Sequence, residues 1–155
     1  MARSGGAKAM LPEAVKRPLR RVRAEYRQLT SPLRGLPAVL IIGTQKGGTT
    51  SLFNYLVEHP HVLPSLTKEV HYFDLNYRSG LPWYRARFPY QRQLNGRISL
   101  DATPYYMTHP LAPERAARLF PDIKLIALLR NPIERAYSHY QHEKRGGRES
   151  LSFEE

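Results

Sequence analysis

Cysteine is absent from this chain of 155 residues, and acidic residues are scarce beside basic ones. Without cysteine the chain has no disulfide framework and no thiolate zinc site, which agrees with a reducing compartment. No stretch approaches the about 18 consecutive apolar residues that a membrane span needs, and the first residues lack the apolar core of a signal peptide. The sequence therefore predicts a cytoplasmic protein with no membrane span, or a soluble piece of an anchored protein.

The positive charge is concentrated near the N-terminus. The chain has a formal net charge of +11, and residues 1–37 contain nine Lys or Arg residues against two Glu. We therefore expect a basic N-terminal extension over residues 1–37 and a separate domain over residues 38–155. No nucleic-acid-reading motif accompanies the charge, so we expect no nucleic-acid partner. The six His residues show no convincing ligand spacing, and we predict no metal site.

Short apolar runs alternate with amphipathic segments along the chain. We expect strands at 38–42, 98–102 and 124–129, a short extended piece near 62–63, and helices at 12–29, 50–58, 83–88, 113–120 and 131–144. Buried strands that alternate with helices predict an α/β fold in which a central parallel sheet lies between two helical layers. Three strands make a narrow sheet, so we expect a fold that is incomplete at its C-terminal side.

The stretch GTQKGGTT, residues 43–50, follows the first predicted strand and precedes a helix. Glycines let the backbone approach an anion closely, and the N-terminus of the helix adds a partial positive charge. A nucleoside-triphosphate loop has its lysine directly before the Ser or Thr. Here that position is Thr49 and the lysine is Lys46. The loop therefore predicts a phosphate-like ligand and disfavours metal-dependent kinase chemistry.

A second motif starts where the 124–129 strand ends and reads RNPIERAYSHY, residues 130–140. Arg130 lies at the carboxyl edge of the predicted sheet, where open α/β folds bind ligands. Ser138 lies about two turns into the following helix. The two side chains suit a second anion, although an arginine before Asn-Pro is also a common way to begin a helix.

Together these stretches resemble the sulfotransferases that use 3′-phosphoadenosine 5′-phosphosulfate (PAPS). That family has K-x-G-T-T after its first strand and R-N-P-x-x-R-x-x-S-x-Y at its second motif, and both patterns occur here. The segment KEVHYFD, residues 68–74, is similar to the K-E-x-x-x-F-D segment of the carbohydrate branch, which includes heparan sulfate enzymes and bacterial relatives. The resemblance implies a P-loop-like fold and an N-terminal portion of the family domain.

The resemblance also implies roles for individual residues. Lys46 would neutralise charge on the leaving oxygen without a metal. Glu69 would be the base that deprotonates the acceptor hydroxyl, with His71 as the alternative base, an acceptor contact or a packed side chain. The residues that would contact the PAPS donor are Gly47, Gly48, Thr49, Thr50, Arg130 and Ser138. Those that would contact the acceptor are Lys68 and Asp74.

The predicted activity is sulfuryl transfer from PAPS to a hydroxyl of a carbohydrate or glycolipid-like acceptor, leaving 3′,5′-adenosine bisphosphate. The chain departs from the family at Ala102, where many relatives carry a lysine, and it stops before the C-terminal part of the family domain. Two alternatives stay open at this point. One is a P-loop small-molecule kinase, and the other is a truncated nucleotide-binding module without catalysis.

Overall fold

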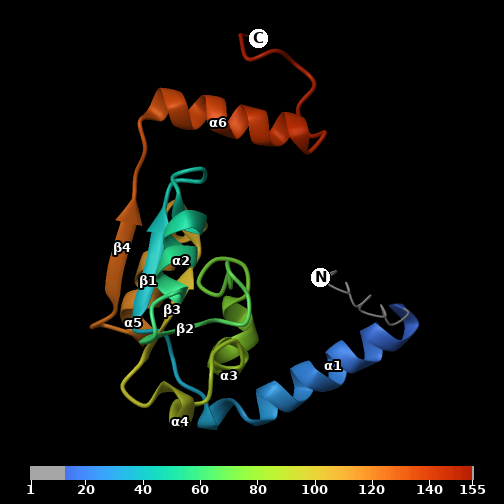
Figure 1. Ribbon diagram of the computed structural model, residues 1–155, viewed down its shortest axis with the longest axis vertical. Coiled ribbons are helices and arrows are strands. Elements are labelled where there is room, and N and C mark those ends of the chain that lie inside the picture. The colour runs from blue at the N-terminus through green and yellow to red at the C-terminus, as the bar shows by residue number, and fades with distance from the viewer. Residues whose placement is uncertain (1–12, 155) are drawn as a thin grey trace, which may run out of the picture.

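The fold is built around a parallel sheet. The computed structural model describes residues 13–154, and its four strands lie in the order β2-β3-β1-β4 (Figure 1). The strands are β1 (Val39–Gly43), β2 (Val62–Pro64), β3 (Ile98–Ala102) and β4 (Lys124–Leu128). The extended piece expected near residue 62 is therefore a strand of the sheet, and the other three strands lie within one residue of the expected bounds.

The parallel register brings the ends of the strands to one edge. Val39 of β1 pairs with Leu100 of β3 on one side and with Lys124 of β4 on the other, and Gly43 pairs with Leu128. The carboxyl ends of β1, β3 and β4 are therefore neighbours. The segments that follow them begin at the same edge of the sheet, where open α/β folds bind their ligands.

The predicted helices are present, with small shifts. They are α1 (Glu13–Leu29), α2 (Thr49–Val57), α3 (Gly80–Arg85), α5 (Ala112–Leu119) and α6 (Pro132–Arg145). The helix expected at 83–88 begins three residues earlier, because Pro82 occupies the first turn of α3, where no backbone N–H donor is needed. The short α4 (Gln91–Leu94) and three 3-10 turns, at 31–33, 77–79 and 104–107, are further elements.

A hydrophobic core lies on each face of the sheet, and alternate residues of β1 face the two cores. Val39 and Ile41 pack with α2, while Leu40 packs with the aromatic segment around Phe73 and with α5. Four of the eight buried residues of this second core are aromatic residues of the segment 72–88. Helices and loops thus cover both faces, and the predicted three-layer α/β fold is confirmed.

β4 differs from the buried strand that its apolar sequence suggests. Leu125 is 59% exposed and Ile126 is 37% exposed, because β4 is an edge strand that pairs with β1 alone among the described residues. The following helix α6 does not pack on β4 but extends beyond the carboxyl edge of the sheet (Figure 1). No helix within residues 13–154 is both long and apolar enough to cross a membrane.

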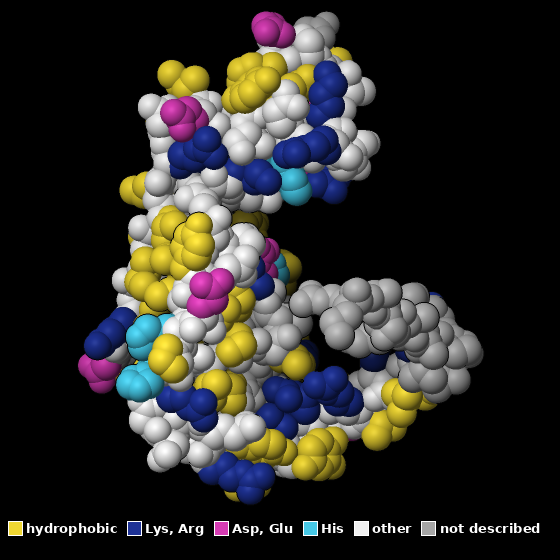
Figure 2. Space-filling model, in the orientation of Figure 1, with side chains coloured by type: hydrophobic (Ala, Val, Ile, Leu, Met, Phe, Trp, Pro, Cys, Tyr) yellow, Lys and Arg dark blue, Asp and Glu magenta, His cyan; other side chains and the backbone are white. Residues whose placement is uncertain are grey.

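The C-terminal end of the basic N-terminal segment packs against the domain. Arg27 donates to the carbonyl oxygens of Ala86 and Phe88, and the buried Arg34 donates to Phe88. Burial, together with the charges of neighbouring arginines, lowers the pKa of Arg27 to about 10. Figure 2 shows Lys and Arg side chains between α1 and the body of the domain, and hydrophobic side chains on the outer side of α1.

Candidate functional site

The glycine loop between β1 and α2 is packed tightly against β4. The Thr44 N–H donates to the Leu128 carbonyl oxygen at 2.9 Å, and the Gly47 N–H donates to the Thr44 carbonyl oxygen at 2.9 Å. A Cβ on Gly43 would lie 2.2 Å from the Leu128 carbonyl oxygen, so only glycine fits there. Gly48 begins α2 with a φ of 98°, which also favours glycine. The sequence thus forms the sharp strand-to-helix turn that the motif predicts.

Two features of this loop suit an anionic ligand. Thr44 lines one of the cavities described below, and its buried hydroxyl has no hydrogen-bond partner among the described residues. Thr49 opens α2 and is 4% exposed, with the free amides of the helix N-terminus beside it. An oxyanion such as a phosphate fits both features.

The second motif reaches the glycine loop across the edge of the sheet. Arg130 Nη1 donates to the carbonyl oxygen of Lys46 at 3.3 Å, and Arg130 Nε lies 3.3 Å from the Glu134 carboxylate. Asn131 caps α6, since its side-chain oxygen accepts from the N–H groups of Ile133 and Glu134. The Asn-Pro pair therefore begins the helix as predicted, and Arg130 is held beside the loop.

One cavity brings the predicted donor-binding residues together. Its volume is about 420 Å³, and among its lining residues are Lys46, Gly48, Thr49, Thr50, Glu69, Arg130 and Ser138. Residues that are more than 80 positions apart in the sequence thus face one space. Gly47 contributes to the loop but not to this lining.

A second cavity of about 700 Å³ lies on the other side of Glu69. It is lined by Gly43, Thr44, Gln45, Glu69, His71, Pro104, Tyr105, Thr108 and Arg135. Glu69, Gln45 and Pro104 line both cavities. Glu69 therefore borders both spaces.

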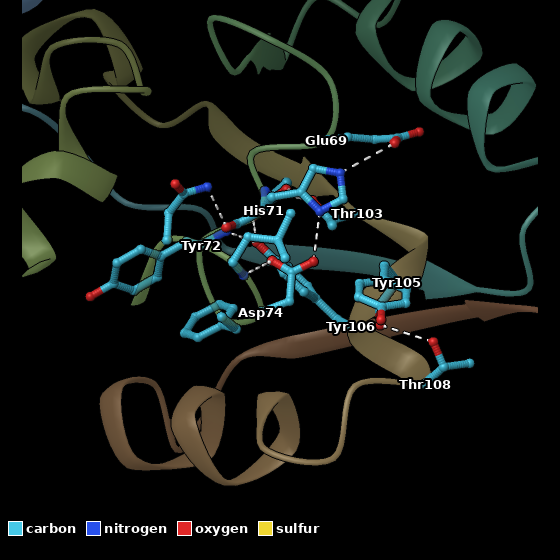
Figure 3. Close-up of polar contacts among 12 residues, drawn as sticks. Glu69, His71, Tyr72, Asp74, Thr103, Tyr105, Tyr106 and Thr108 are labelled. Carbon is cyan, nitrogen blue, oxygen red and sulfur yellow. Dashed lines mark hydrogen bonds and ion pairs between the residues drawn. The ribbon is translucent and has the colours of Figure 1, made fainter. Parts of the chain in front are cut away.

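Glu69, His71 and Asp74 form a line of polar contacts (Figure 3). His71 Nδ1 lies 2.6 Å from Asp74 Oδ2, and His71 Nε2 lies 3.5 Å from Glu69 Oε2. The side chain of Asp74 is fully buried, and its other oxygen accepts from the Leu75 N–H. Asp74 thus orients the imidazole of His71 towards Glu69.

Lys68 contacts the other side of Glu69. Its Nζ is hydrogen-bonded to Glu69 Oε1, and the Lys68 side chain is 20% exposed. The observed partners of Lys68 and Asp74 are thus Glu69 and His71, and their expected acceptor contacts stay predictions. The arrangement places a carboxylate between an ammonium and an imidazole at the mouth of a cavity.

The backbone is strained at the predicted catalytic residues. Among the described residues, four that are not glycine have a left-handed φ, and three of them are Lys46 (66°), Glu69 (60°) and His71 (54°). Such a conformation is unfavourable for a residue with a Cβ, and it concentrates at functional sites where surrounding contacts maintain it. All three side chains belong to the same site.

A buried carboxylate lies beneath the 69–74 loop. Asp101 is 0% exposed and accepts hydrogen bonds from the hydroxyls of Thr103 at 2.7 Å and of Tyr84 and Tyr106 at 2.9 Å. Burial raises the pKa of Asp101, while the three hydroxyls and the Val70 N–H oppose this rise. Burial, followed by the charge of Asp101, raises the pKa of Tyr84 and Tyr106. Both phenols therefore keep their protons and act as donors.

Several residues that line the cavities are not among the predicted site residues: Gln45, Tyr105, Thr108, Arg135 and His142. Gln45 and Arg135 lie inside the two motifs, so their positions are a signal in the sequence. Tyr105 and Thr108 follow β3 at the carboxyl edge, and the Thr-Pro pair directly after this strand marks their turn. Tyr105 is 50% exposed and lines the larger cavity together with His71 and Glu69.

Comparisons with known proteins agree with this geometry. A sulfotransferase-domain family model matches residues 36–152. The human "Heparan sulfate glucosamine 3-O-sulfotransferase 6" is 45% identical over 107 residues, which are 69% of this chain and 30% of that protein. The human "Bifunctional heparan sulfate N-deacetylase/N-sulfotransferase 3" is 40% identical over 115 residues, which are 70% of this chain and 13% of that protein.

A solved structure supports the same assignment. The crystal structure of a sulfotransferase from Alicyclobacillus acidocaldarius matches with a TM-score of 0.65 and 27% identity, over 77% of this chain and 55% of that one. The chain thus spans less than a third of the length of the two curated relatives named above. The glycine loop and the Arg130 motif both lie within the matched residues, and the chain belongs to the sulfotransferase family.

Proposed function

We propose that this chain binds PAPS and carries the base of a sulfotransferase that acts on a carbohydrate hydroxyl. One observation carries the proposal: Glu69 lines both the cavity of the glycine loop and the larger cavity beside it. A base that lies between a donor space and an acceptor space suits group transfer, since the hydroxyl must meet the donor in line.

PAPS suits the loop cavity because its anionic groups match the polar and cationic groups of the lining. It supplies a sulfuryl group attached through a phosphate, together with a second phosphate. Lys46, Thr49 and the amides of the loop would hold the first phosphate, and Arg130 with Ser138 would hold the second. Lys46 would also stabilise the charge that develops on the leaving oxygen.

Glu69 would accept the proton of the acceptor hydroxyl as its oxygen bonds to sulfur. The imidazole of His71, oriented by Asp74, lies on one side of this carboxylate, and the ammonium of Lys68 lies on the other. These contacts limit the side-chain positions of Glu69. The proposed acceptor is a polysaccharide that contains hexosamine, because the relatives named above act on heparan sulfate.

Calorimetry and a transfer assay test the proposal. We expect 3′,5′-adenosine bisphosphate to bind in the presence of EDTA more tightly than ATP, and Lys46→Ala to abolish binding, with Lys124→Ala as control. Lys124 begins β4, away from the carboxyl edge. We expect Glu69→Gln to slow transfer from radiolabelled PAPS to a heparan-type acceptor by about 10²–10⁴-fold with unchanged nucleotide binding. Glu58→Gln, at the end of α2, is its control.

The outcomes separate the alternatives. Binding that requires Mg²⁺ and prefers ATP would favour the small-molecule kinase. Metal-independent binding of the bisphosphate without any transfer would favour a nucleotide-binding module that lacks catalysis. Equal transfer rates for Glu69→Gln and Glu58→Gln would rule out Glu69 as the base.

A further inference from the structure

The loop that carries Glu69 and His71 is fastened through its backbone to the end of β3. Three N–H groups of this loop, those of Glu69, His71 and Tyr72, donate to this segment. Their acceptors are the Ala102 carbonyl oxygen for Glu69 (3.1 Å), Thr103 Oγ1 for His71 (3.5 Å) and Tyr106 Oη for Tyr72 (2.8 Å). The whole turn is therefore held from one side.

Two of these three bonds lead to one carboxylate. The hydroxyls of Thr103 and Tyr106 accept from the loop and in turn donate to Asp101. The Val70 N–H lowers the pKa of the same carboxyl group. Successive amides that turn towards one point form a nest for an anion, and here the anion is a side chain of the protein. The carboxylate is fully buried, so water does not compete for these donors.

The nest explains the conformation of the loop. Glu69 and His71 both have a left-handed φ, and Val70 lies between them. Alternation of left-handed and ordinary residues turns successive N–H groups to one side of the backbone. The side chains of Glu69 and His71 point towards each other (Figure 3), and both residues line the larger cavity.

We propose that Asp101 is a positioning residue, which gathers the amides of residues 70–72 and thereby keeps Glu69 and His71 directed into the cavity. The inference rests on the proposed function of Glu69 for its effect on transfer, but its effect on the loop is independent of that function. Asp101 does not line either cavity, so it acts only through the loop.

A matched pair of variants separates positioning from simple stabilisation. Thr103→Val and Tyr84→Phe each remove one hydroxyl bond to Asp101. Thr103 also accepts from the His71 N–H, whereas the Tyr84 hydroxyl has no bond to the loop among the described contacts. Both replacements keep the shape of the side chain, and Thr103→Ser restores the hydroxyl.

The experiment measures amide hydrogen exchange by NMR, together with the imidazole ¹⁵N signals of His71. We expect Thr103→Val to speed exchange at residues 70–72 by about 10-fold, since it removes a hydrogen bond in a charged network. The His71 signals should shift, and kcat should fall by about 10-fold or more because the base is misplaced. KM and affinity for the bisphosphate should stay unchanged. Thr103→Ser should restore all readouts, and Tyr84→Phe should leave the loop readouts at wild-type values.

Equal exchange rates in Thr103→Val and Tyr84→Phe would overturn the inference, since a merely structural network would respond equally to both. A loss of thermal stability in Thr103→Val with unchanged exchange and His71 signals would overturn it as well. If the wild-type chain transfers no sulfate, the proposed function fails, while the exchange rates of residues 70–72 in Asp101→Asn still decide the role of Asp101. Asp101→Asn is the stronger second variant and should change the same signals.

Discussion

The glycine loop offers a sharp test because one methyl group can displace it. In Gly47→Ala the new Cβ would lie 2.7 Å from Thr44 Oγ1, 2.8 Å from the Thr44 carbonyl oxygen and 3.2 Å from the Leu128 carbonyl oxygen. Both carbonyl oxygens already accept loop N–H groups, so neither can move without breaking a bond. Overpacking of this kind costs about 1–3 kcal/mol. For a chain of this size, Tm should fall by about 2–4 °C per kcal/mol.

The functional effect should exceed the loss of stability. A loop pushed away from Leu128 no longer presents its amides to a phosphate, so we expect the Kd for 3′,5′-adenosine bisphosphate to rise by about 10-fold or more, which corresponds to about 1.4 kcal/mol. Calorimetry measures this Kd, and circular dichroism measures Tm.

Gly96→Ala is the matched control for this prediction. Gly96 has a φ of 81°, and a methyl group added there would meet no atom within 4 Å. Alanine at this position therefore introduces backbone strain of about 1–2 kcal/mol without a clash. It should lower Tm and leave nucleotide affinity unchanged. A wild-type Kd in Gly47→Ala would refute the reasoning that this close-packed turn forms the binding site.

Three further predictions concern other parts of the chain. Asn131→Ala removes the cap of α6 and should cost about 1 kcal/mol, measured by urea unfolding; an unchanged midpoint would contradict the capping role. In the folded state the pKa of the Asp101 carboxyl is raised above its usual value of 3.8, so the folded state binds this proton more tightly than the unfolded chain. The free energy of unfolding therefore falls as the pH rises from 3.8 through the folded-state pKa. The difference in unfolding free energy between wild type and Asp101→Asn should show this slope, and a pH-independent difference would refute it. Brief trypsin treatment should cut α1 at the exposed Arg20, Arg21 and Arg23 before it cuts at Arg27 or the buried Arg34. Early cleavage at Arg34 would show that residues 27–37 are not docked on the domain.

The strands, the glycine loop and the cap of α6 could be predicted from the sequence because each depends on neighbouring residues. A short apolar run stopped by Gly43 specifies a buried strand and a turn, and Asn131 followed by Pro132 specifies a helix start. The proximity of Lys46 and Arg130 could be expected because the parallel sheet brings the carboxyl ends of β1 and β4 to one edge.

The conformation of the 69–74 loop could not be predicted in this way. The left-handed φ of Glu69 and His71 depends on bonds to residues about 32 positions later in the chain, and no local pattern encodes them. The exposure of β4 is a similar case. Its apolar sequence is compatible with burial, but burial depends on the neighbours of a strand in space.

The proposed division at residue 37 likewise needs the three-dimensional contacts. Composition separates a basic segment from the domain, yet Arg27 and Arg34 donate hydrogen bonds to the carbonyl oxygens of Ala86 and Phe88, just after α3. We therefore retain residues 38–155 as the proposed domain and expect residues 27–37 to remain attached to it. The basic segment contains both a docked part and an exposed part.

The open edge of β4 has a consequence for the behaviour of the chain in solution. Within residues 13–154 no strand pairs with the outer edge of β4, and the backbone groups there, beside the exposed Leu125 and Ile126, offer a template for a strand of another molecule. The net charge of +11 opposes such encounters through repulsion. Salt shortens the range of that repulsion to about 8 Å at 0.15 M. Colloidal stability should therefore decrease as ionic strength rises, and light scattering would follow it.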